Sequence, residues 1–291
     1  MLAHLINGIS LGSIYAIIAL GYTMVYGIAK MLNFAHGDVI MVGGYVSFCF
    51  MSYMNVPAPI AVLLAMAICT VLGITIERLA YKPLRSATSL AVLITAIGMS
   101  YFLQNSALII WGANPKAYPN IFKDIEAFEM VGGARVSPVA VVAITANLVI
   151  MIILTLFTSR TKMGKAMRAV SEDKGAATLM GINVNFTISM TFAIGSGLAA
   201  IAGVLLCTAY PTLMPTTGSM PGIKAFTAAV FGGIGSIPGA MIGGILLGVI
   251  EILARAYISS ELADAIVFGV LIVVLIFRPT GLLGKQIHEK V

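Results

Sequence analysis

Long apolar runs separated by short polar segments dominate the chain. About 20 apolar residues in a helix that rises 1.5 Å per residue cross a bilayer core about 30 Å thick. A glycine-rich run at 222–253 is long enough for two short passes, or for a re-entrant hairpin followed by one pass. The other runs lie at 5–28, 39–54, 60–79, 89–111, 138–157, 186–210 and 265–277. This pattern predicts an all-α polytopic membrane protein with about eight or nine transmembrane helices, in which residues 1–291 form a single domain.

The composition agrees with a membrane protein. Hydrophobic residues make up 59% of the chain and charged residues 10%, and the mean hydropathy is +1.03. Soluble domains carry about 25% charged residues, so a soluble protein is excluded. The net charge of +6 comes from short basic clusters between apolar runs, which is typical of topology-setting loops and not of a nucleic-acid surface. We expect a lipid bilayer as partner and no nucleic acid.

The basic residues also predict an orientation. Lysine and arginine concentrate in the cytoplasmic loops of membrane proteins. Placing every basic cluster on that side puts the carboxyl terminus in the cytoplasm, and residues 112–137 and the amino terminus outside, in a protein of the bacterial inner membrane. The clusters are Arg78, Lys82 and Arg85, then Arg160, Lys162, Lys165, Arg168 and Lys174, then Arg278, Lys285 and Lys290.

Two stretches, near 30–45 and 218–248, break the uniform apolar pattern. The second is dense in glycine and contains Pro221 and Pro238, which remove backbone donors and interrupt helices. Irregular backbone at membrane depth is tolerated only where protein or a water-filled cavity surrounds it. The segments HGDVIMVGGYV (36–46) and PGAMIGGILLG (238–248) also resemble each other faintly. Transporters are often built from internal repeats with broken helices, so a repeat linking these two segments is one interpretation.

Asn33, His36 and Asp38 place three polar side chains within six residues between apolar runs. Ionisable groups inside a membrane are candidates for a translocation path or gate. The alternative is a cytoplasmic turn, with Asn33 capping a helix and Asp38 stabilised by the positive end of the helix dipole. One histidine and one aspartate do not make a closed set of metal ligands, so no metal site is predicted.

Further polar residues lie within the apolar runs. Glu251 precedes Arg255 by four residues, which places both on one helix face. They either neutralise each other near the outer surface, or Glu251 belongs to the path or gate. Gln104 and Asn105 lie inside the run at 89–111, where we expect hydrogen bonds across helices.

Residues 158–184 form a basic segment with helical character, with Gly164 near one end and Gly181 near the other. Alanines lie between its charged residues. A short helix with a small-residue face can lie in a groove on a partner protein, while basic side chains bind the rim. The alternative is a solvated topology loop.

No nucleotide-binding or catalytic signature occurs in the chain. A P-loop requires G-x-x-x-x-G-K-[ST], which is absent, as are G-x-S-x-G and H-E-x-x-H. The chain is therefore not expected to be an enzyme. Any energy for transport must come from another chain or from an ion gradient.

Four stretches together resemble a known family, the LivH-type permease subunits of branched-chain amino-acid ABC importers. They run from near the amino terminus to near the carboxyl terminus, so the resemblance covers essentially the whole chain. The stretches are GYTMVYGIAKMLNFAHGDVIMVGGY (21–45), GKAMRAVSEDKGAATLMGINV (164–184), KAFTAAVFGGIGSIPGAMIGGILLGVIE (224–251) and FRPTGLLG (277–284).

The resemblance implies a permease that pairs with a second, related permease subunit. It also implies two cytoplasmic ATPase subunits, which bind ATP and Mg, and a periplasmic solute-binding protein; the chain itself holds no cofactor. The imported substrate would be a branched-chain or related amino acid. By the same resemblance, 158–184 is the coupling loop that rests on an ATPase, with coupling residues Gly164, Ala169, Glu172, Ala176, Ala177 and Gly181.

An ion-coupled secondary transporter that works without ATPase subunits is the alternative. It would use His36, Asp38 or Glu251 as its coupling groups. The segment 158–184 distinguishes the two hypotheses, because a transporter that works alone has no need of a docking loop.

Overall fold

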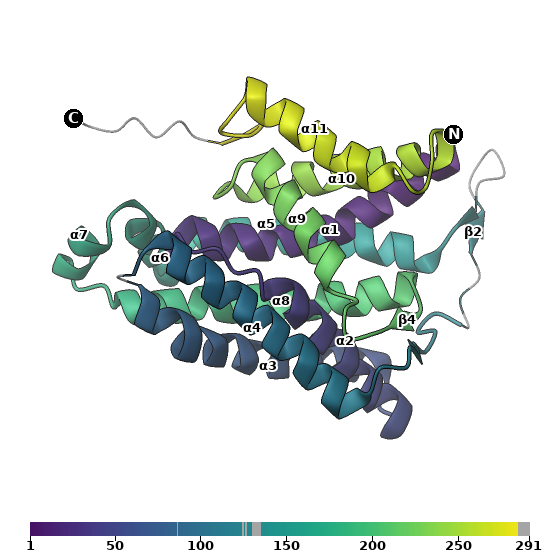
Figure 1. Ribbon diagram of the computed structural model, residues 1–291, viewed down its shortest axis with the longest axis horizontal. Coiled ribbons are helices and arrows are strands. Elements are labelled where there is room, and N and C mark those ends of the chain that lie inside the picture. The colour runs from purple at the N-terminus through teal and green to yellow at the C-terminus, as the bar shows by residue number, and fades with distance from the viewer. Residues whose placement is uncertain (86, 124, 126, 130–134, 285–291) are drawn as a thin grey trace.

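The computed structural model describes residues 1–284 except 86, 124, 126 and 130–134, and helices account for most of them (Figure 1). A π-helical turn at Glu77–Tyr81 and a 3-10 turn at Lys82–Leu84 extend the third helix. The α-helices are α1 (Leu2–Ala29), α2 (His36–Tyr53), α3 (Ala58–Ile76), α4 (Ser89–Trp111), α5 (Pro138–Arg160), α6 (Lys162–Glu172), α7 (Lys174–Leu179), α8 (Val184–Ala209), α9 (Ser219–Gly232), α10 (Ile237–Tyr257) and α11 (Ala263–Phe277).

The strands are short and lie outside the helical bundle. They form two antiparallel pairs of two residues per strand: β1 (Lys116–Ala117) with β4 (Thr212–Leu213), and β2 (Phe128–Glu129) with β3 (Arg135–Val136). The first pair fixes the segment after α4 to the segment after α8.

The prediction of an all-α polytopic membrane protein is confirmed. Within the described residues, six helices are long and apolar enough to cross a membrane: α1, α3 with its extension, α4, α5, α8 and α10. The apolar helix α11 is shorter, at 15 residues. The two broken stretches contain α2 and α9. At 14 residues, α9 is about 21 Å long, too short to cross a core of about 30 Å.

The bundle has two distinct ends. We call the end that carries α6 and α7 the basic end, and the end that carries the short strands the loop end (Figure 1). Helix α1 runs from the loop end, where the amino terminus lies, to the basic end, where Lys174 contacts the carbonyl of Ala29. The amino terminus therefore lies at the same end as β1, β2 and β3, the strands in the described part of the segment between α4 and α5, as predicted.

The segment after α11 also lies at the basic end. The backbone N–H groups of Leu282 and Leu283 donate to the carbonyls of Phe231 and Gly232, at the end of α9. This places Arg278, from the third basic cluster, at the end of the bundle that carries the second cluster. Lys285 and Lys290 lie outside the described residues.

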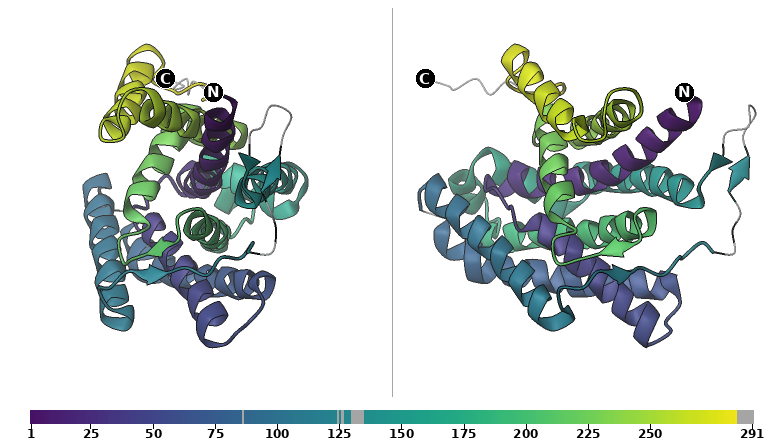
Figure 2. Two further views of the ribbon diagram at one scale, coloured as in Figure 1. Left: turned by 90° about the vertical axis from the view of Figure 1, so that its right-hand side faces the viewer. Right: turned by 45° about the vertical axis from the view of Figure 1, so that its right-hand side comes forward.

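Helices α1 and α8 form the core of the bundle. In the most apolar window of α1, 89% of the residues are buried, and in that of α8, 83%; the corresponding value for α4 is 17%. Viewed from the loop end, the other helices surround this pair, and α9 runs between α4 and α11 (Figure 2). Because α1 and α8 contact protein on nearly all sides, they have no polar face turned to solvent.

Small residues bring the central helices into close contact. A Cβ atom at Gly12 of α1 would lie 2.6 Å from the Cα of Ile245 in α10. One at Gly43 of α2 would lie 2.7 Å from the Cα of Ala200 in α8, and Gly21 faces Gly195 where α1 crosses α8. Such contacts provide the van der Waals packing that holds helices together in a bilayer, where the hydrophobic effect contributes little.

The same order of elements occurs twice along the chain, and the second set runs through the bundle in the opposite direction to the first. Helix α1, an extended segment, the short helix α2, α3 and α4 correspond to α8, an extended segment, the short helix α9, α10 and α11. Contacts follow the same relation: α1 packs on α10 as α8 packs on α3, and α2 packs on α4 as α9 packs on α11. An internal repeat is therefore present, but it pairs α2 with α9. The predicted pairing of 36–46 with 238–248 is wrong, because the latter residues begin α10.

The glycine contacts generate a prediction. Replacing Gly12 by leucine should lower the free energy of unfolding by about 1–3 kcal/mol or more, because the added side chain overpacks the contact between α1 and α10. The change would be measured as a lower Tm of the purified protein in detergent.

Gly98→Leu is the matched control. A Cβ atom at Gly98, on the outer side of α4, would have no atom within 4 Å, and leucine favours a helix over glycine by about 0.5–1 kcal/mol. The control should therefore leave Tm unchanged or raise it. Equal losses in the two variants would show that the α1–α10 contact does not limit stability.

Candidate functional site

Helices α2 and α9 begin inside the bundle, with their first turns in contact. Gly37, in the first turn of α2, faces Gly218 and Gly222 of α9: a Cβ atom at Gly222 would lie 2.8 Å from the Cα of Gly37. Residues 31–35 and 211–218, which belong to no helix, carry the chain into this position. The positive ends of two helix dipoles therefore meet at one place. We call it the helix-start centre.

Asp38 is the buried carboxylate of this centre. Gln104 of α4 donates from Nε2 to Asp38 Oδ1 at 2.9 Å. The same nitrogen lies 3.2 Å from the hydroxyl of Ser219, the first residue of α9, and 3.2 Å from that of Ser100. One amide thus connects α2, α4 and α9. The predicted cross-helix bond of Gln104 is confirmed, whereas that of Asn105 is wrong: its side chain is exposed and donates to Tyr101 O of its own helix.

Asn33 and His36 are also buried, but they have separate partners. Asn33 Oδ1 accepts a hydrogen bond of 2.9 Å from Tyr81 OH, and its side chain does not cap α2. The His36 ring packs on Tyr22, with centroids 4.6 Å apart, and fits because Gly21 has no side chain. Among the described residues, His36 Nε2 has no hydrogen-bond partner. The expected cap by Asn33 is therefore wrong, whereas Asp38 lies in the first turn of α2, as the alternative interpretation predicted; all three side chains are buried.

Glu251 lies elsewhere, in a charged cluster that joins α1, α9, α10 and α11. Its carboxylate accepts from Tyr15 OH at 2.9 Å and from Lys224 Nζ at 2.8 Å, and it pairs with Arg255. Lys224 Nζ also lies 2.6 Å from Asp264 Oδ1. Two cations and two carboxylates therefore compensate one another, in a setting where an unpaired buried charge costs several kcal/mol.

The predicted path residues thus occupy separate positions. Asp38 belongs to the helix-start centre, beside His36, whereas Glu251 belongs to the charged cluster. The predicted Glu251–Arg255 pair is present, but sequence reasoning missed Lys224 and Asp264. A signal for Lys224 existed, because it is the one charged residue in the stretch 218–248 and intramembrane charges mark functional positions.

The segment 158–184 forms two short helices at the basic end. Thr161 Oγ1 accepts from Gly164 N at 3.0 Å and begins α6, and Asp173 Oδ1 accepts from Ala176 N at 2.9 Å and begins α7. Lys174 Nζ donates to Ala29 O at 3.2 Å, where the negative end of the α1 dipole favours a cation. Burial, followed by the neighbouring Arg85 and Lys30, lowers the pKa of Lys174.

The six predicted coupling residues divide by exposure. Gly164 and Ala177 are buried within this chain, and Ala169 is half-buried. Glu172, Ala176 and Gly181 are exposed, and Gly181 has a left-handed φ of 79°. The first group holds the segment on the bundle, and the second group can contact a partner.

Sequence reasoning missed two apolar residues at the tip of the segment. Leu179 is 90% exposed and Met180 is 82% exposed. Neighbouring apolar side chains exposed on a polar loop are candidates for contact with a partner protein. Together with Glu172, Ala176 and Gly181, they form what we call the docking tip.

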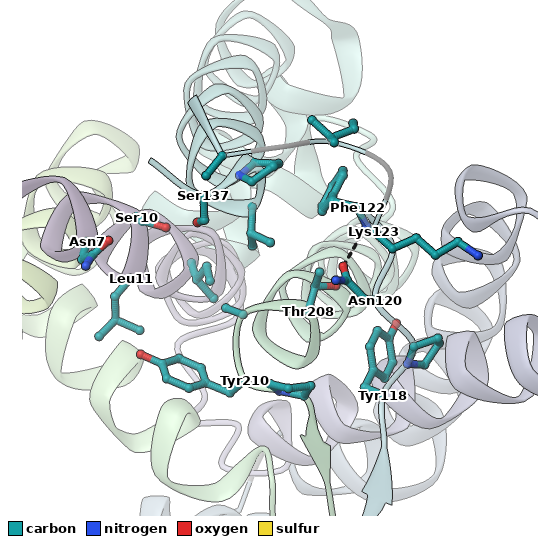
Figure 3. Close-up of a pocket in the computed structure, with 18 of the residues that line it drawn as sticks. Asn7, Ser10, Leu11, Tyr118, Asn120, Phe122, Lys123, Ser137, Thr208 and Tyr210 are labelled. Carbon is teal, nitrogen blue, oxygen red and sulfur yellow. Dashed lines mark hydrogen bonds between the residues drawn. The ribbon is translucent and has the colours of Figure 1, made fainter. Parts of the chain in front are cut away.

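Two hollows stand out among the described residues. The larger, about 570 Å³, lies at the loop end between α1, α5, α8 and the segment before α5 (Figure 3). Among its described lining residues, Lys123 carries the single formal charge, and its side chain extends away from the hollow in Figure 3. The smaller, about 310 Å³, is lined by Lys224, Arg255 and Asp264 of the charged cluster.

The Gln104 bridge generates a prediction. Gln104→Leu should lower the free energy of unfolding by about 1–3 kcal/mol, because it leaves the buried Asp38 carboxylate without its donor. Thermal unfolding in detergent measures the loss. The neighbouring Asn105→Leu is the control and should change Tm little, since Asn105 is exposed and bonds its own helix. A larger loss of Tm in Asn105→Leu than in Gln104→Leu would contradict a stabilising role of the Gln104 hydrogen bonds.

Known proteins resemble this chain over its full length. BraD of Pseudomonas aeruginosa, a high-affinity branched-chain amino acid transport system permease protein, is 45% identical over 100% of this chain and 98% of its own length. The LivH proteins of Salmonella typhimurium and Escherichia coli K12, described in the same words, are 47% and 46% identical over 100% of this chain and 97% of theirs.

A family model agrees with these relatives. The model described as the permease component of branched-chain amino acid transport systems matches residues 4–275. The match includes both short helices, the charged cluster and the docking tip. The chain therefore belongs to this family of membrane transport permeases.

Proposed function

We propose that the chain is the membrane-spanning permease subunit of an ABC importer that moves branched-chain or related amino acids across the bacterial inner membrane. The family and its full-length relatives support this assignment. The observation that carries it is the docking tip at the basic end of the bundle, where Leu179 and Met180 are exposed. An exposed apolar tip can dock on a partner protein, and this chain contains no P-loop of its own.

The orientation follows from the basic end. The described members of all three basic clusters lie on segments at this end, and cytoplasmic loops are rich in lysine and arginine. The docking tip then faces the cytoplasm, with the carboxyl terminus on the same side. The loop end and the amino terminus face the periplasm.

This orientation assigns a place to each partner. Two cytoplasmic ATPase subunits bind ATP and Mg, and one of them receives the docking tip. A periplasmic solute-binding protein delivers substrate to the loop end, and a second, related permease completes the path. ATP binding draws the ATPases together, moves the docking segments and shifts the permease pair between two states. The segment's bond from Lys174 to Ala29 gives the movement a direct contact with α1.

An ion-coupled transporter that works alone is less well supported. Such a protein needs a carboxylate that exchanges its proton or ion during the cycle. Asp38 is bonded to Gln104, and Glu251 is bonded to Tyr15, Lys224 and Arg255. The docking tip also has no use in that mechanism.

Ala176→Glu should reduce amino-acid uptake at least tenfold while the permease still inserts into the membrane. Ala176 is exposed in this chain, so folding is preserved, whereas an unpaired charge in an interface costs about 2–5 kcal/mol. Uptake of labelled leucine and copurification of the ATPase subunits are the two measurements.

Met54→Asp is the control that places a new charge at the opposite end of the bundle. Met54 is 66% exposed at the loop end, so this charge should leave ATPase copurification intact. The coupling role would be refuted by normal uptake and normal ATPase binding in Ala176→Glu.

The purified permease alone should hydrolyse no ATP, and addition of the partner ATPases should supply the activity. Release of inorganic phosphate measures the turnover. Steady hydrolysis by the single chain, resistant to further purification, would overturn the division of labour.

A further inference from the structure

A pocket at the side of the bundle opens onto the charged cluster. It has a volume of about 310 Å³, at the lower end of the range of about 300–1,000 Å³ that small-molecule sites occupy. Its walls come from α1, the end of α8, the segment before α9, α9 itself, α10 and α11. It therefore lies where the loop end meets the start of α9, on the route from the proposed binding-protein side to the helix-start centre.

The pocket presents charges of both signs. Lys224 is 5% exposed at its side chain and lies between Glu251 and Asp264. The side chains of Arg255 and Asp264 are 36% and 40% exposed, and both line the pocket. Glu251 is fully buried and already holds Tyr15 and two cations. Arg255 and Asp264 are thus a cation and an anion of the cluster that remain accessible to a ligand.

Apolar side chains complete the walls. Leu206, Met220 and Pro221 line the pocket beside the charged residues, and Tyr15 and Tyr210 add aromatic rings. A site with few convergent polar groups on an apolar wall is typical of small-ligand binding. An ion-pair network that served stability alone would not need such an opening.

We propose that this pocket is a binding site for a zwitterionic amino acid with an apolar side chain during its passage through the permease. Arg255 receives the α-carboxylate, Asp264 receives the α-ammonium, and the wall of Leu206, Met220 and Pro221 receives the side chain. Lys224 keeps the cluster neutral when Asp264 turns to the ligand. This inference rests on the proposed function and adds the residues that recognise the substrate.

The chemistry explains why the cluster is neutral and partly open. A zwitterion carries two opposite charges, each of which is costly to move into a low-dielectric region without a partner. A guanidinium and a carboxylate together are neutral. They offer a partner to the carboxylate and to the ammonium of the zwitterion, and the net charge of the region stays unchanged. The larger hollow lacks this property, since Lys123 is the single formal charge among its described lining residues.

The pocket also leads inward. Met220, on its wall, adjoins Ser219, whose hydroxyl lies 3.2 Å from Gln104 Nε2 in the helix-start centre. The first turn of α9 therefore joins the pocket to the helix-start centre. In the proposal, the pocket is the position from which substrate enters toward that centre.

Thiol protection tests the site in the assembled transporter in proteoliposomes. Met220→Cys is introduced after Cys49, Cys69 and Cys207 have been replaced by alanine, and its reaction with a water-soluble maleimide is followed. Leucine should slow the reaction in a saturable way, by about tenfold at ten times its dissociation constant. Met214→Cys, on the same segment but outside the pocket, should react at a rate that leucine does not change.

Analogues and charge variants test the assigned roles. N-acetylleucine lacks the ammonium and leucinamide lacks the carboxylate, so neither should protect the Met220→Cys thiol. Asp264→Asn should raise the leucine concentration needed for protection about tenfold or more, as expected for loss of one charge-assisted hydrogen bond. Glu261→Gln, an exposed carboxylate near the start of α11 outside the pocket, should not change it.

The outcomes separate this inference from the proposed function. If ATP-driven uptake occurs but leucine at its solubility limit does not protect the thiol, the pocket is not a substrate site and the importer assignment stands. Equal protection by leucine and N-acetylleucine would likewise overturn the role of Asp264. If the assembled transporter shows no ATP-dependent uptake at all, the proposed function itself fails.

Discussion

Close glycine-mediated packing is the constraint on which the rest of the structure depends. Non-helical backbone cannot face lipid, because its unpaired N–H and C=O groups would each cost several kcal/mol. The segments 31–35 and 214–218 are such backbone, and the positions in them that are buried among the helices are Met31, Asn33, Ala35, Pro215 and Gly218. Contacts such as Gly12 with Ile245 let those helices form a tight shell.

The inverted order of elements explains why the helix-start centre exists. Each half of the repeat contributes one short helix that begins within the bundle, and the opposite direction of the halves brings the two first turns together. The positive ends of both helix dipoles then lie close together. Asp38 and Ser219 occupy this centre, and Gln104 connects them.

Helix α9 connects the functional regions. Its first turn touches the helix-start centre through Ser219, its second turn carries Lys224 of the charged cluster, and its end bonds the backbone of Leu282 and Leu283 at the basic end. A short helix with polar contacts at its start and backbone contacts at its end can transmit a displacement between the two sides. The charged cluster limits that displacement, because moving Lys224 alone would leave Glu251 and Asp264 short of a cation.

The sequence by itself determined the class of the protein and the position of its irregular segments. Apolar runs of bilayer length and the low charge content specify a helical membrane protein, because a bilayer admits few other backbones. Glycine marked both broken stretches and proline the second, and the basic clusters correctly grouped the segments that share one end. These properties depend on residues that are neighbours along the chain, so they can be predicted from the order of residues alone.

Contacts between distant residues were decided by the tertiary structure alone. Asp38 with Gln104 and Lys224 with Asp264 join helices that are far apart in sequence, and no periodicity encodes which polar residues meet. The exposure of Leu179 and Met180 is equally hidden, because the same residues could have packed inward. Helix packing chooses among many pairings of similar local energy, which is why the pocket and the docking tip emerge only from the fold.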